Sequence, residues 1–303
     1  MNAASAPGAS PLLSVAALAE GLSDPNTVIV DVRWQLGEPG AGRRAYAASH
    51  LPGAIFLDLD TDLADLGGYG APGRHPLPSP ADFAARLAFA GIGDESFVVG
   101  YDDVGGWVAA RLWWMLDNLG HRGGAAVLDG GWQAWLAAGL PTTTEVARRP
   151  PAARPPRLRA AWTHVIQREA LRSRLGELVL LDARAAPRYR GETEPIDPYP
   201  GHIPTAISAP WEGNVGPDGR LLPRDSLRDH FAALGAGADA SGEVVAYCGS
   251  GVTATHHALA RRVAGLSDPT IYVGSYSDWS RSGLPVATGP DPGAAEIARS
   301  DRS

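Results

Sequence analysis

The residues most able to do chemistry lie in a short loop around Cys248, the only cysteine among the 303 residues. Residues 244–247 before it form a short apolar run typical of a strand, and residues 254–263 after it have the pattern of a helix. Gly249 and Gly251 let the backbone curl so that several N–H groups point inward, next to the positive end of the helix. Such a turn stabilises an anion, so a thiolate is expected at Cys248. The alternative is a lone cysteine that is buried and inert.

The chain contains two copies of one pattern, and this loop belongs to the second copy. Four segments recur in the same order, at offsets of 146, 151, 152 and 144 residues. They pair 98–102 with 244–248, 30–33 with 181–184, 50–55 with 202–207, and Trp135 with Trp279. Offsets of this size indicate a duplicated domain rather than a solenoid, whose repeats are much shorter. The first copy has Asp102 where the second has Cys248, so the first half is expected to supply structure and part of the cleft wall.

A proline-rich segment separates the two copies. Residues 148–156 read Arg-Arg-Pro-Pro-Ala-Ala-Arg-Pro-Pro. This composition cannot continue a helix or a central strand and is typical of a semi-rigid linker. We therefore predict an N-terminal domain without the cysteine over residues 1–148, a linker over 149–158 and a C-terminal catalytic domain over 159–303.

Within each copy, short apolar runs alternate with helical patterns. Strands are expected in the first copy at 27–30, 54–57, 97–101 and 125–128, and in the second at 178–181, 206–208, 244–247 and 270–273. Helices are expected in the first copy at 81–90, 108–119 and 133–138. This alternation predicts an α/β fold in which each domain is a parallel sheet covered by helices on both faces. Functional groups of such sheets lie beyond the carboxyl ends of the strands, which is where Cys248 falls.

Composition argues against several classes of function. The net charge of −7 is unfavourable for a general nucleic-acid binder. No run of about 18 apolar residues occurs and the first residues lack a basic stretch, so neither a membrane span nor a secretory signal is expected. A single cysteine forms no internal disulfide and suits a reducing cytoplasm. No cofactor motif is present, and the adjacent His256 and His257 should point apart in a helix, so we expect neither a cofactor nor a metal site.

The tandem copies, the Asp-x-Arg motif in each, the His-Ile-Pro motif at His202 and the loop Cys-Gly-Ser-Gly-Val-Thr-Ala resemble the rhodanese superfamily. From about Ser14 to Thr288 the chain resembles in particular its two-domain 3-mercaptopyruvate sulfurtransferases. The resemblance implies that Cys248 accepts a sulfane sulfur, becomes a persulfide and passes the sulfur to a thiol or another nucleophile. N–H donors at a helix N-terminus suit both the thiolate and the persulfide anion. The sulfur would be bound by the backbone amides of the loop residues Gly249, Ser250, Gly251, Val252, Thr253 and Ala254.

The resemblance also bears on the sulfur donor. Thiosulfate sulfurtransferases typically carry Cys-Arg-Lys-Gly-Val-Thr, whose two cations suit a dianionic donor, whereas Gly249 and Ser250 stand at those positions here. A neutral loop favours 3-mercaptopyruvate, a monoanionic carboxylate. Arg188 matches the substrate-binding arginine of the family, and a guanidinium can hold a carboxylate with two parallel hydrogen bonds. The second arginine of the family is missing from residues 194–197, and Arg190 is expected to compensate.

The same subfamily is proposed to use a relay of serine, histidine and aspartate beside the cysteine. By resemblance these are Ser250, His75 and Asp60. A relay is chemically sensible, because breaking the carbon–sulfur bond of mercaptopyruvate leaves an enolate that must gain a proton. His75 and Asp60 come from the first domain, so the site is expected between the domains. Alternatively, Asp60 caps a helix over residues 63–66 and His75 is an ordinary loop residue.

Other reaction classes fit the loop less well. A cysteine phosphatase needs Cys-x5-Arg, but Ala254 stands six positions after Cys248. A serine hydrolase acting through Ser250 needs Gly-x-Ser-x-Gly, and here Cys248 and Val252 replace the two glycines. A thiosulfate:cyanide sulfurtransferase and a persulfide carrier that turns over no free small molecule stay open as alternatives. The expected partners are a small-molecule sulfur donor and a thiol or thioredoxin-like acceptor, without nucleic acid or membrane.

Overall fold

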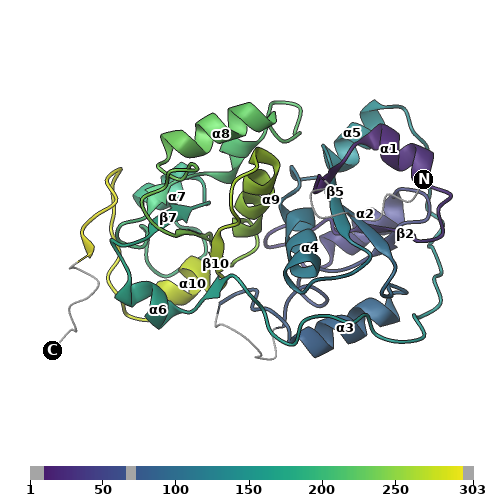
Figure 1. The fold of residues 1–303 in the computed structure, drawn as a ribbon, viewed down its shortest axis with the longest axis horizontal. Coiled ribbons are helices and arrows are strands. Elements are labelled where there is room, and N and C mark those ends of the chain that lie inside the picture. The colour runs from purple at the N-terminus through teal and green to yellow at the C-terminus, as the bar shows by residue number, and fades with distance from the viewer. Residues whose placement is uncertain (1–9, 66–72, 296–303) are drawn as a thin grey trace. The chain divides into compact units, whose positions relative to one another are not determined.

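The computed structural model describes residues 10–65 and 73–295, and Figure 1 shows their fold as a ribbon. These residues form two compact units. Unit 1 contains residues 10–65, 78–163 and 216–221, and unit 2 contains residues 73–77, 164–215 and 222–295. A short piece of each half of the chain, 73–77 and 216–221, therefore belongs to the unit that the other half mainly forms.

Unit 1 is built on a five-stranded sheet in which every neighbouring pair of strands is parallel. The strand order is β1-β5-β4-β2-β3. Along the chain the elements are β1 (Leu12–Leu13), α1 (Val15–Gly21), β2 (Thr27–Asp31), α2 (Ala41–Ala48), β3 (Ile55–Phe56), α3 (Pro80–Phe89), β4 (Phe97–Tyr101), α4 (Trp107–Asn118), β5 (Ala125–Leu128) and α5 (Gly131–Ala137).

Side chains at alternate strand positions pack on opposite faces of this sheet. Ile29, Val99 and Tyr101 share one core cluster with residues of α1, α2 and α5. On the other face Gly100 lies against α4, because a Cβ built on Gly100 would be 3.6 Å from the side chain of Ala109. Helices therefore cover both faces, and each fully buried aliphatic side chain contributes about 1.5–3 kcal/mol to stability.

Unit 2 repeats this architecture. Its five parallel strands have the order β6-β10-β9-β7-β8, which matches the order in unit 1 strand for strand. Its elements are β6 (Val165–Ile166), α6 (Arg168–Ser173), β7 (Val179–Asp182), α7 (Ala186–Arg190), β8 (Ile207–Ser208), η1 (Trp211–Asn214), α8 (Arg224–Ala233), β9 (Val244–Tyr247), α9 (Ala254–Ala264), β10 (Thr270–Tyr272) and α10 (Ser275–Trp279). The predicted duplication of an α/β fold is confirmed, and each of the eight predicted strands overlaps an observed one.

The duplicated Asp-x-Arg motif is a buried ion pair at the end of a central strand in each unit. Arg33 Nη2 lies 2.6 Å from Asp31 Oδ2, and Arg184 Nη2 lies 2.6 Å from Asp182 Oδ2. Each arginine also donates to a backbone carbonyl downstream, at 2.6 Å and 2.7 Å respectively. Because both copies use the motif in the same way, it stabilises the fold at the strand end.

The duplicated histidine motif is structural in the same sense. The His50 ring stacks on Tyr46 with centroids 3.9 Å apart, and the His202 ring stacks on Tyr189 at 3.7 Å. In each pair the histidine Nδ1 is hydrogen-bonded to the carbonyl of the stacked tyrosine, at 2.7 Å and 2.8 Å. Both histidines are fully buried. These histidines therefore hold the loop before the third strand of the chain in each unit.

The proline-rich segment lies against unit 1. Ala152 N–H donates to the carbonyl of Ala88 at 2.8 Å, and Arg157 N–H donates to Asp94 Oδ1 at 2.6 Å. Residues up to 163 belong to unit 1 in the division into compact units. The domain limits at 148 and 159 stay a prediction from composition.

Candidate functional site

Cys248 is located at the carboxyl end of β9, directly before the turn into α9. Its N–H donates to Ser275 Oγ at 3.2 Å, and its carbonyl accepts from the N–H of Tyr276 at 2.9 Å. Ser275 has a φ of 54°, a left-handed value that is uncommon outside glycine. The turn before α10 therefore holds the cysteine backbone in place. Cys248 is 2% exposed.

Gly251 brings a backbone donor to the sulfur. Its N–H donates to Cys248 Sγ at 3.2 Å. It has a φ of +78°, and a Cβ there would lie 2.4 Å from the carbonyl oxygen of Val273. Only glycine fits both requirements, so the local sequence dictates the curl of the loop. The following residues Val252, Thr253 and Ala254 lead into the first turn of α9, whose N–H groups carry the positive end of the helix dipole.

The matching loop of unit 1 is closed by its own carboxylate. Asp102, which takes the place of the cysteine, is 1% exposed and accepts four backbone N–H bonds at 2.8–3.0 Å. Burial raises the pKa of Asp102 above its ordinary value, and these four N–H donors act in the opposite direction. The turn before α4 therefore forms a cradle of four N–H donors, which the carboxylate of Asp102 occupies, whereas in unit 2 one N–H, that of Gly251, is hydrogen-bonded to the sulfur.

His75 and Ser250 are brought together in unit 2. His75 Nδ1 and Ser250 Oγ are hydrogen-bonded at 2.8 Å, although 175 residues separate them in the chain. The segment 73–77 is held against unit 2 by Arg74, whose N–H donates to Ser277 Oγ at 3.1 Å. Gly73 fits this close approach, because a Cβ there would lie 2.7 Å from the carbonyl oxygen of Gly274. His75 is 6% exposed and is therefore no ordinary surface loop residue.

Asp60 lies in unit 1. Its Oδ2 accepts from Trp34 Nε1 at 3.0 Å, and its own N–H donates to Asp58 Oδ1 at 2.8 Å. Residues 63–65 form no helix, so the alternative in which Asp60 caps a helix there is wrong. Its part in a relay stays a prediction.

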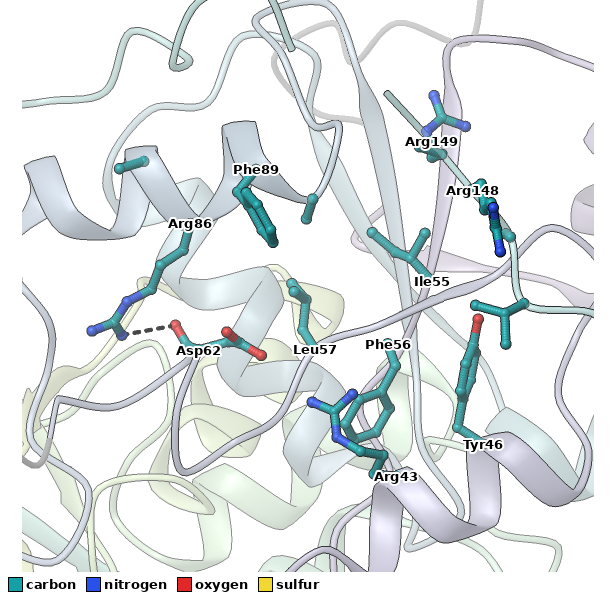
Figure 2. Close-up of a pocket in the computed structure, with 14 residues that line it drawn as sticks. Arg43, Tyr46, Ile55, Phe56, Leu57, Asp62, Arg86, Phe89, Arg148 and Arg149 are labelled. Atoms are coloured by element: carbon teal, nitrogen blue, oxygen red, sulfur yellow. Dashed lines mark hydrogen bonds between the residues drawn. The ribbon is translucent and has the colours of Figure 1, made fainter. Parts of the chain in front are cut away.

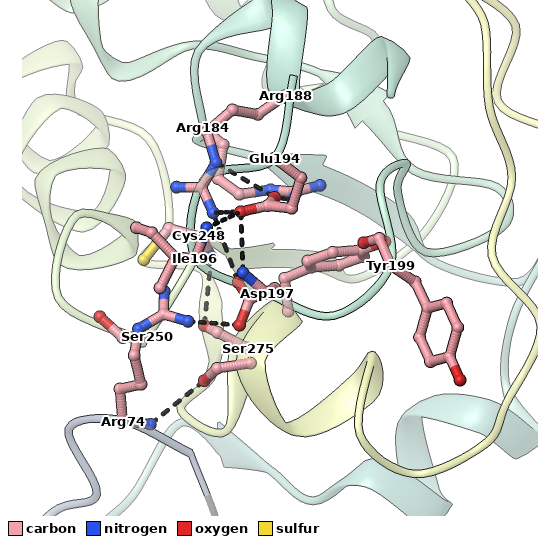
Figure 3. A network of polar contacts seen from close by, with 12 residues as sticks. Arg74, Arg184, Arg188, Glu194, Ile196, Asp197, Tyr199, Cys248, Ser250 and Ser275 are labelled. Carbon is pink, nitrogen blue, oxygen red and sulfur yellow. Dashed lines mark hydrogen bonds and ion pairs between the residues drawn. The ribbon is translucent and has the colours of Figure 1, made fainter. Parts of the chain in front are cut away.

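Arg188 projects from α7 into a network of ion pairs, which Figure 3 shows together with Cys248 and Ser250. Its Nε and Nη2 donate to Glu194 at 3.2 Å and 2.6 Å, and Nη2 also lies 3.3 Å from Asp197 Oδ2. Burial alone raises the pKa of Glu194, but the bond from Arg188 and the N–H groups of Ile196 and Asp197 outweigh it. The pKa of Glu194 therefore lies below its ordinary value, and the carboxylate stays ionised beside the arginine.

Arg190 is oriented differently from Arg188. Its Nε and Nη2 pair with Glu192 at 2.7 Å and 2.8 Å, and the pair is partly exposed. The structure therefore brings Arg188, but not Arg190, to the ion-pair network beside the loop. Arg74 and Asp197 also belong to that network and were not predicted from the sequence. The signal for Arg74 was its position next to His75 in the chain.

The adjacent histidines of α9 do not point apart as expected. His256 and His257 are both fully buried, and their Nδ1 atoms lie 3.2 Å and 3.0 Å from Asn214 Nδ2. Adjacent residues of a helix usually point apart, but here both rings reach the side-chain amide of Asn214 in η1. Burial, followed by the neighbouring His256, lowers the pKa of His257 to about 3. Within residues 10–65 and 73–295, no group of three or more His, Cys, Asp or Glu side chains could hold a metal ion.

A separate pocket of about 680 Å³ lies in unit 1 and is shown in Figure 2. Its wall combines the rings of Phe56 and Phe89 with the guanidinium groups of Arg43, Arg86 and others. The residues that line it include none of those predicted for catalysis or substrate binding. Across the described part of the chain, no helix is long and apolar enough to span a membrane.

Comparison with known proteins places these features in one family. The rhodanese-like domain family matches residues 14–138 and 167–282. A Pseudomonas aeruginosa protein named "Probable 3-mercaptopyruvate sulfurtransferase" is 46% identical over 92% of this chain and 98% of its own. A thiosulfate sulfurtransferase of Rattus norvegicus is 33% identical over 90% of this chain and 93% of its own. The solved structure of a Leishmania major 3-mercaptopyruvate sulfurtransferase aligns with a TM-score of 0.78 and 32% identity, covering 92% of this chain and 76% of that one. Two matched segments, two sheets of identical strand order and this level of identity show that the chain belongs to the rhodanese family.

Proposed function

We propose that this protein is a sulfurtransferase that moves a sulfane sulfur from 3-mercaptopyruvate, through a persulfide on Cys248, to a thiol or another nucleophilic acceptor. The observation that carries the proposal is the geometry of the loop. The Gly251 N–H lies 3.2 Å from Cys248 Sγ at the start of α9, and the Ser250–His75 pair stands beside it. Relatives named as 3-mercaptopyruvate and thiosulfate sulfurtransferases support the reaction class.

In the first step, the Cys248 thiolate attacks the sulfur of mercaptopyruvate. A sulfur–sulfur bond forms, the carbon–sulfur bond breaks, and its electron pair leaves with the three-carbon unit as the enolate of pyruvate. The donor's thiol loses its proton, the enolate carbon gains one, and the products are pyruvate and the Cys248 persulfide anion. Loop N–H groups and the α9 dipole stabilise the negative charge on sulfur both before and after this step.

The relay residues have a definite task in this scheme. Ser250 and His75 are already hydrogen-bonded at 2.8 Å, so they can accept the donor's thiol proton and return a proton to carbon. The overall step then requires no net proton from water. Asp60 is proposed as the third member of the relay, as the resemblance implies.

In the second step, an acceptor thiolate attacks the outer sulfur of the persulfide. The sulfur–sulfur bond to Cys248 breaks, its electron pair returns to Cys248 as thiolate, and the acceptor leaves as a persulfide. We propose a small thiol or a thioredoxin-like protein as acceptor. A single cysteine, which forms no internal disulfide, supports work in a reducing compartment such as the cytoplasm.

Thiosulfate is the second candidate donor, because one observation favours it. The loop itself carries no cation, yet Arg74 and Arg188 both reach to the space beside Gly249. Two guanidinium groups there suit a dianion as well as a carboxylate.

The test is steady-state sulfur transfer from 3-mercaptopyruvate and from thiosulfate to a small thiol and to cyanide, with Cys248→Ser as the blank. Intact-protein mass spectrometry after incubation with donor alone should show one added sulfur on the wild type and none on Cys248→Ser. A preference for thiosulfate would overturn the donor assignment. Persulfide formation without turnover would indicate a carrier, and no added sulfur from either donor would refute the proposed function.

A further inference from the structure

Two guanidinium groups converge beside the residue that follows the cysteine. A Cβ built on Gly249 would lie 2.7 Å from Arg74 Nη2 and 3.5 Å from Arg188 Nη1. The two arginines come from distant parts of the chain, from the segment 73–77 and from α7. Gly249 leaves room for them, because a Cβ there would require the end of the Arg74 side chain to shift. Cationic donors thus reach the edge of the loop although the loop sequence itself is neutral.

Several donors of these two guanidinium groups have no hydrogen-bond partner in the described part of the protein. Arg188 uses Nε and Nη2 on Glu194 and Asp197, which leaves Nη1. Arg74 uses Nη1 on Asp197, and its Nε is buried without a hydrogen-bond partner among the described residues. A buried N–H group without a partner is unfavourable by about 1–3 kcal/mol, and a bound acceptor would remove that penalty.

One buried carboxylate holds both arginines in position. The Asp197 side chain is 0% exposed, with Oδ1 paired to Arg74 and Oδ2 lying 3.3 Å from Arg188 Nη2. Arg281 Nη1 binds the same Oδ1 at 3.1 Å from the more exposed side. Figure 3 shows Asp197 in contact with Arg74 and Arg188, with Cys248 and Ser250 in the same view. Because Asp197 binds both guanidinium groups, they are oriented before a ligand binds.

The charge of the network favours one further anion. Three carboxylates face four guanidinium groups, which leaves one positive charge in excess. The carboxylates are those of Asp182, Glu194 and Asp197, and the guanidinium groups are those of Arg74, Arg184, Arg188 and Arg281. A monoanionic ligand would neutralise the network.

We propose that Arg74 is a substrate-binding residue that, together with Arg188, holds the carboxylate of the sulfur donor. The inference rests on the proposed function and deepens it. The carboxylate would accept from Arg74 Nε and Nη2 and from Arg188 Nη1, which are the donors without partners. Arg74 directly precedes His75, so one short segment both binds the donor and supplies a proton-transfer group. It is Arg74, rather than Arg190, that serves as the second arginine of the site.

A purely structural role is the competing explanation. In that case the Arg74–Asp197 pair only fastens the segment 73–77, and Arg74 affects the reaction by positioning His75. The two roles differ in one respect: a carboxylate-binding arginine discriminates between donors with and without a carboxylate, whereas a fastening residue affects both donors equally.

The experiment compares 3-mercaptopyruvate with mercaptopropanone, in which a methyl group replaces the carboxylate. We expect Arg74→Ala to raise KM for mercaptopyruvate about 10- to 100-fold, and to change kcat/KM for mercaptopropanone less than about threefold. Arg74→Lys keeps the charge but loses the planar donor pair, so its KM for mercaptopyruvate should lie between those of the wild type and Arg74→Ala. Arg281→Ala reports the effect of disturbing Asp197 alone, and Arg174→Ala, in a surface pair with Glu243, is the matched control.

A binding measurement separates this inference from the proposed function. Calorimetric titration with pyruvate, the expected product, needs no turnover, and Arg74→Ala should weaken that binding by about tenfold or more. An equal loss of kcat/KM with mercaptopyruvate and mercaptopropanone, or unchanged pyruvate binding in Arg74→Ala, would overturn the role of Arg74. If the wild type does not turn over mercaptopyruvate, the proposed function fails, and the pyruvate titration still decides whether Arg74 binds carboxylates.

Discussion

The role of the Asp102 loop in unit 1 can be measured directly by replacing its carboxylate. Asp102 stands where the second repeat has Cys248, and its carboxylate accepts the N–H groups of residues 104, 106, 108 and 109 at 2.8–3.0 Å. Asp102→Ala removes the acceptor and leaves four inward-pointing N–H groups without it. We expect this change to destabilise unit 1 while leaving the sulfur chemistry intact.

The magnitude follows from two opposing effects. Each hydrogen bond to a charged group contributes about 1.5–3 kcal/mol, but burial disfavours the ionised carboxylate, as the raised pKa of Asp102 indicates. The intact arrangement is therefore worth much less than four separate bonds. Its disruption should still lower the free energy of unfolding by about 3–5 kcal/mol, the usual range when one partner of a buried charged arrangement is removed.

The assay is urea unfolding at pH 7, followed by circular dichroism and by tryptophan fluorescence. The unfolding transition of unit 1 should shift to lower urea, and the unit 2 transition should stay in place if the units unfold separately. Asp103→Ala is the matched control, since it removes a neighbouring carboxylate outside the cradle and should change stability by less than about 1 kcal/mol. Sulfur-transfer rates, measured well below the transition and expressed per folded molecule, should equal those of the wild type.

Two results would refute this reasoning. A loss of stability in Asp102→Ala no larger than that in Asp103→Ala would mean that the cradle of unit 1 does not need its carboxylate. A large fall in kcat at unchanged stability would mean that the Asp102 loop takes part in the chemistry.

Two further predictions concern unit 2. If Ser250 and His75 transfer the proton to carbon, Ser250→Ala should lower kcat with mercaptopyruvate about 10²- to 10⁴-fold, and should affect thiosulfate, which has no carbon to protonate, far less; equal losses with both donors would contradict the relay. The pKa of His257 is lowered to about 3, so between that pH and about 6.5 the unfolded chain binds a proton that the folded protein does not. The free energy of unfolding should therefore decrease as the pH is lowered from about 6.5 to about 3, by up to about 1.4 kcal/mol per pH unit. In His257→Gln, the free energy of unfolding measured in urea should change less between pH 7 and pH 5 than in the wild type. An equal change in both proteins would contradict this assignment to His257.

Local patterns were sufficient to predict much of the fold. The runs at 97–101 and 244–247 are the central strands β4 and β9, because continuous apolar runs can be buried on both faces of a parallel sheet. Helix α8 was missed, although Leu227 and Phe231 mark its buried stripe four residues apart, because it begins after a proline without a side-chain cap. The short helices α7 and α10, of five residues each, offer too few positions for a helical period to show.

The sequence by itself determined the duplicated α/β fold and the conformation of the Cys248 loop. Both depend on residues that are close in the chain. These are apolar runs of four or five residues that form strands, and Gly251, which has a left-handed φ. The pairing of His75 with Ser250 came only from the family resemblance, and the ion pairs of Arg74 only from the tertiary structure. Arg74 and Asp197 are 123 residues apart, and His75 and Ser250 are 175 apart. Contacts over such separations depend on how whole segments pack, and an arginine that binds a substrate has the same local sequence character as one that faces water.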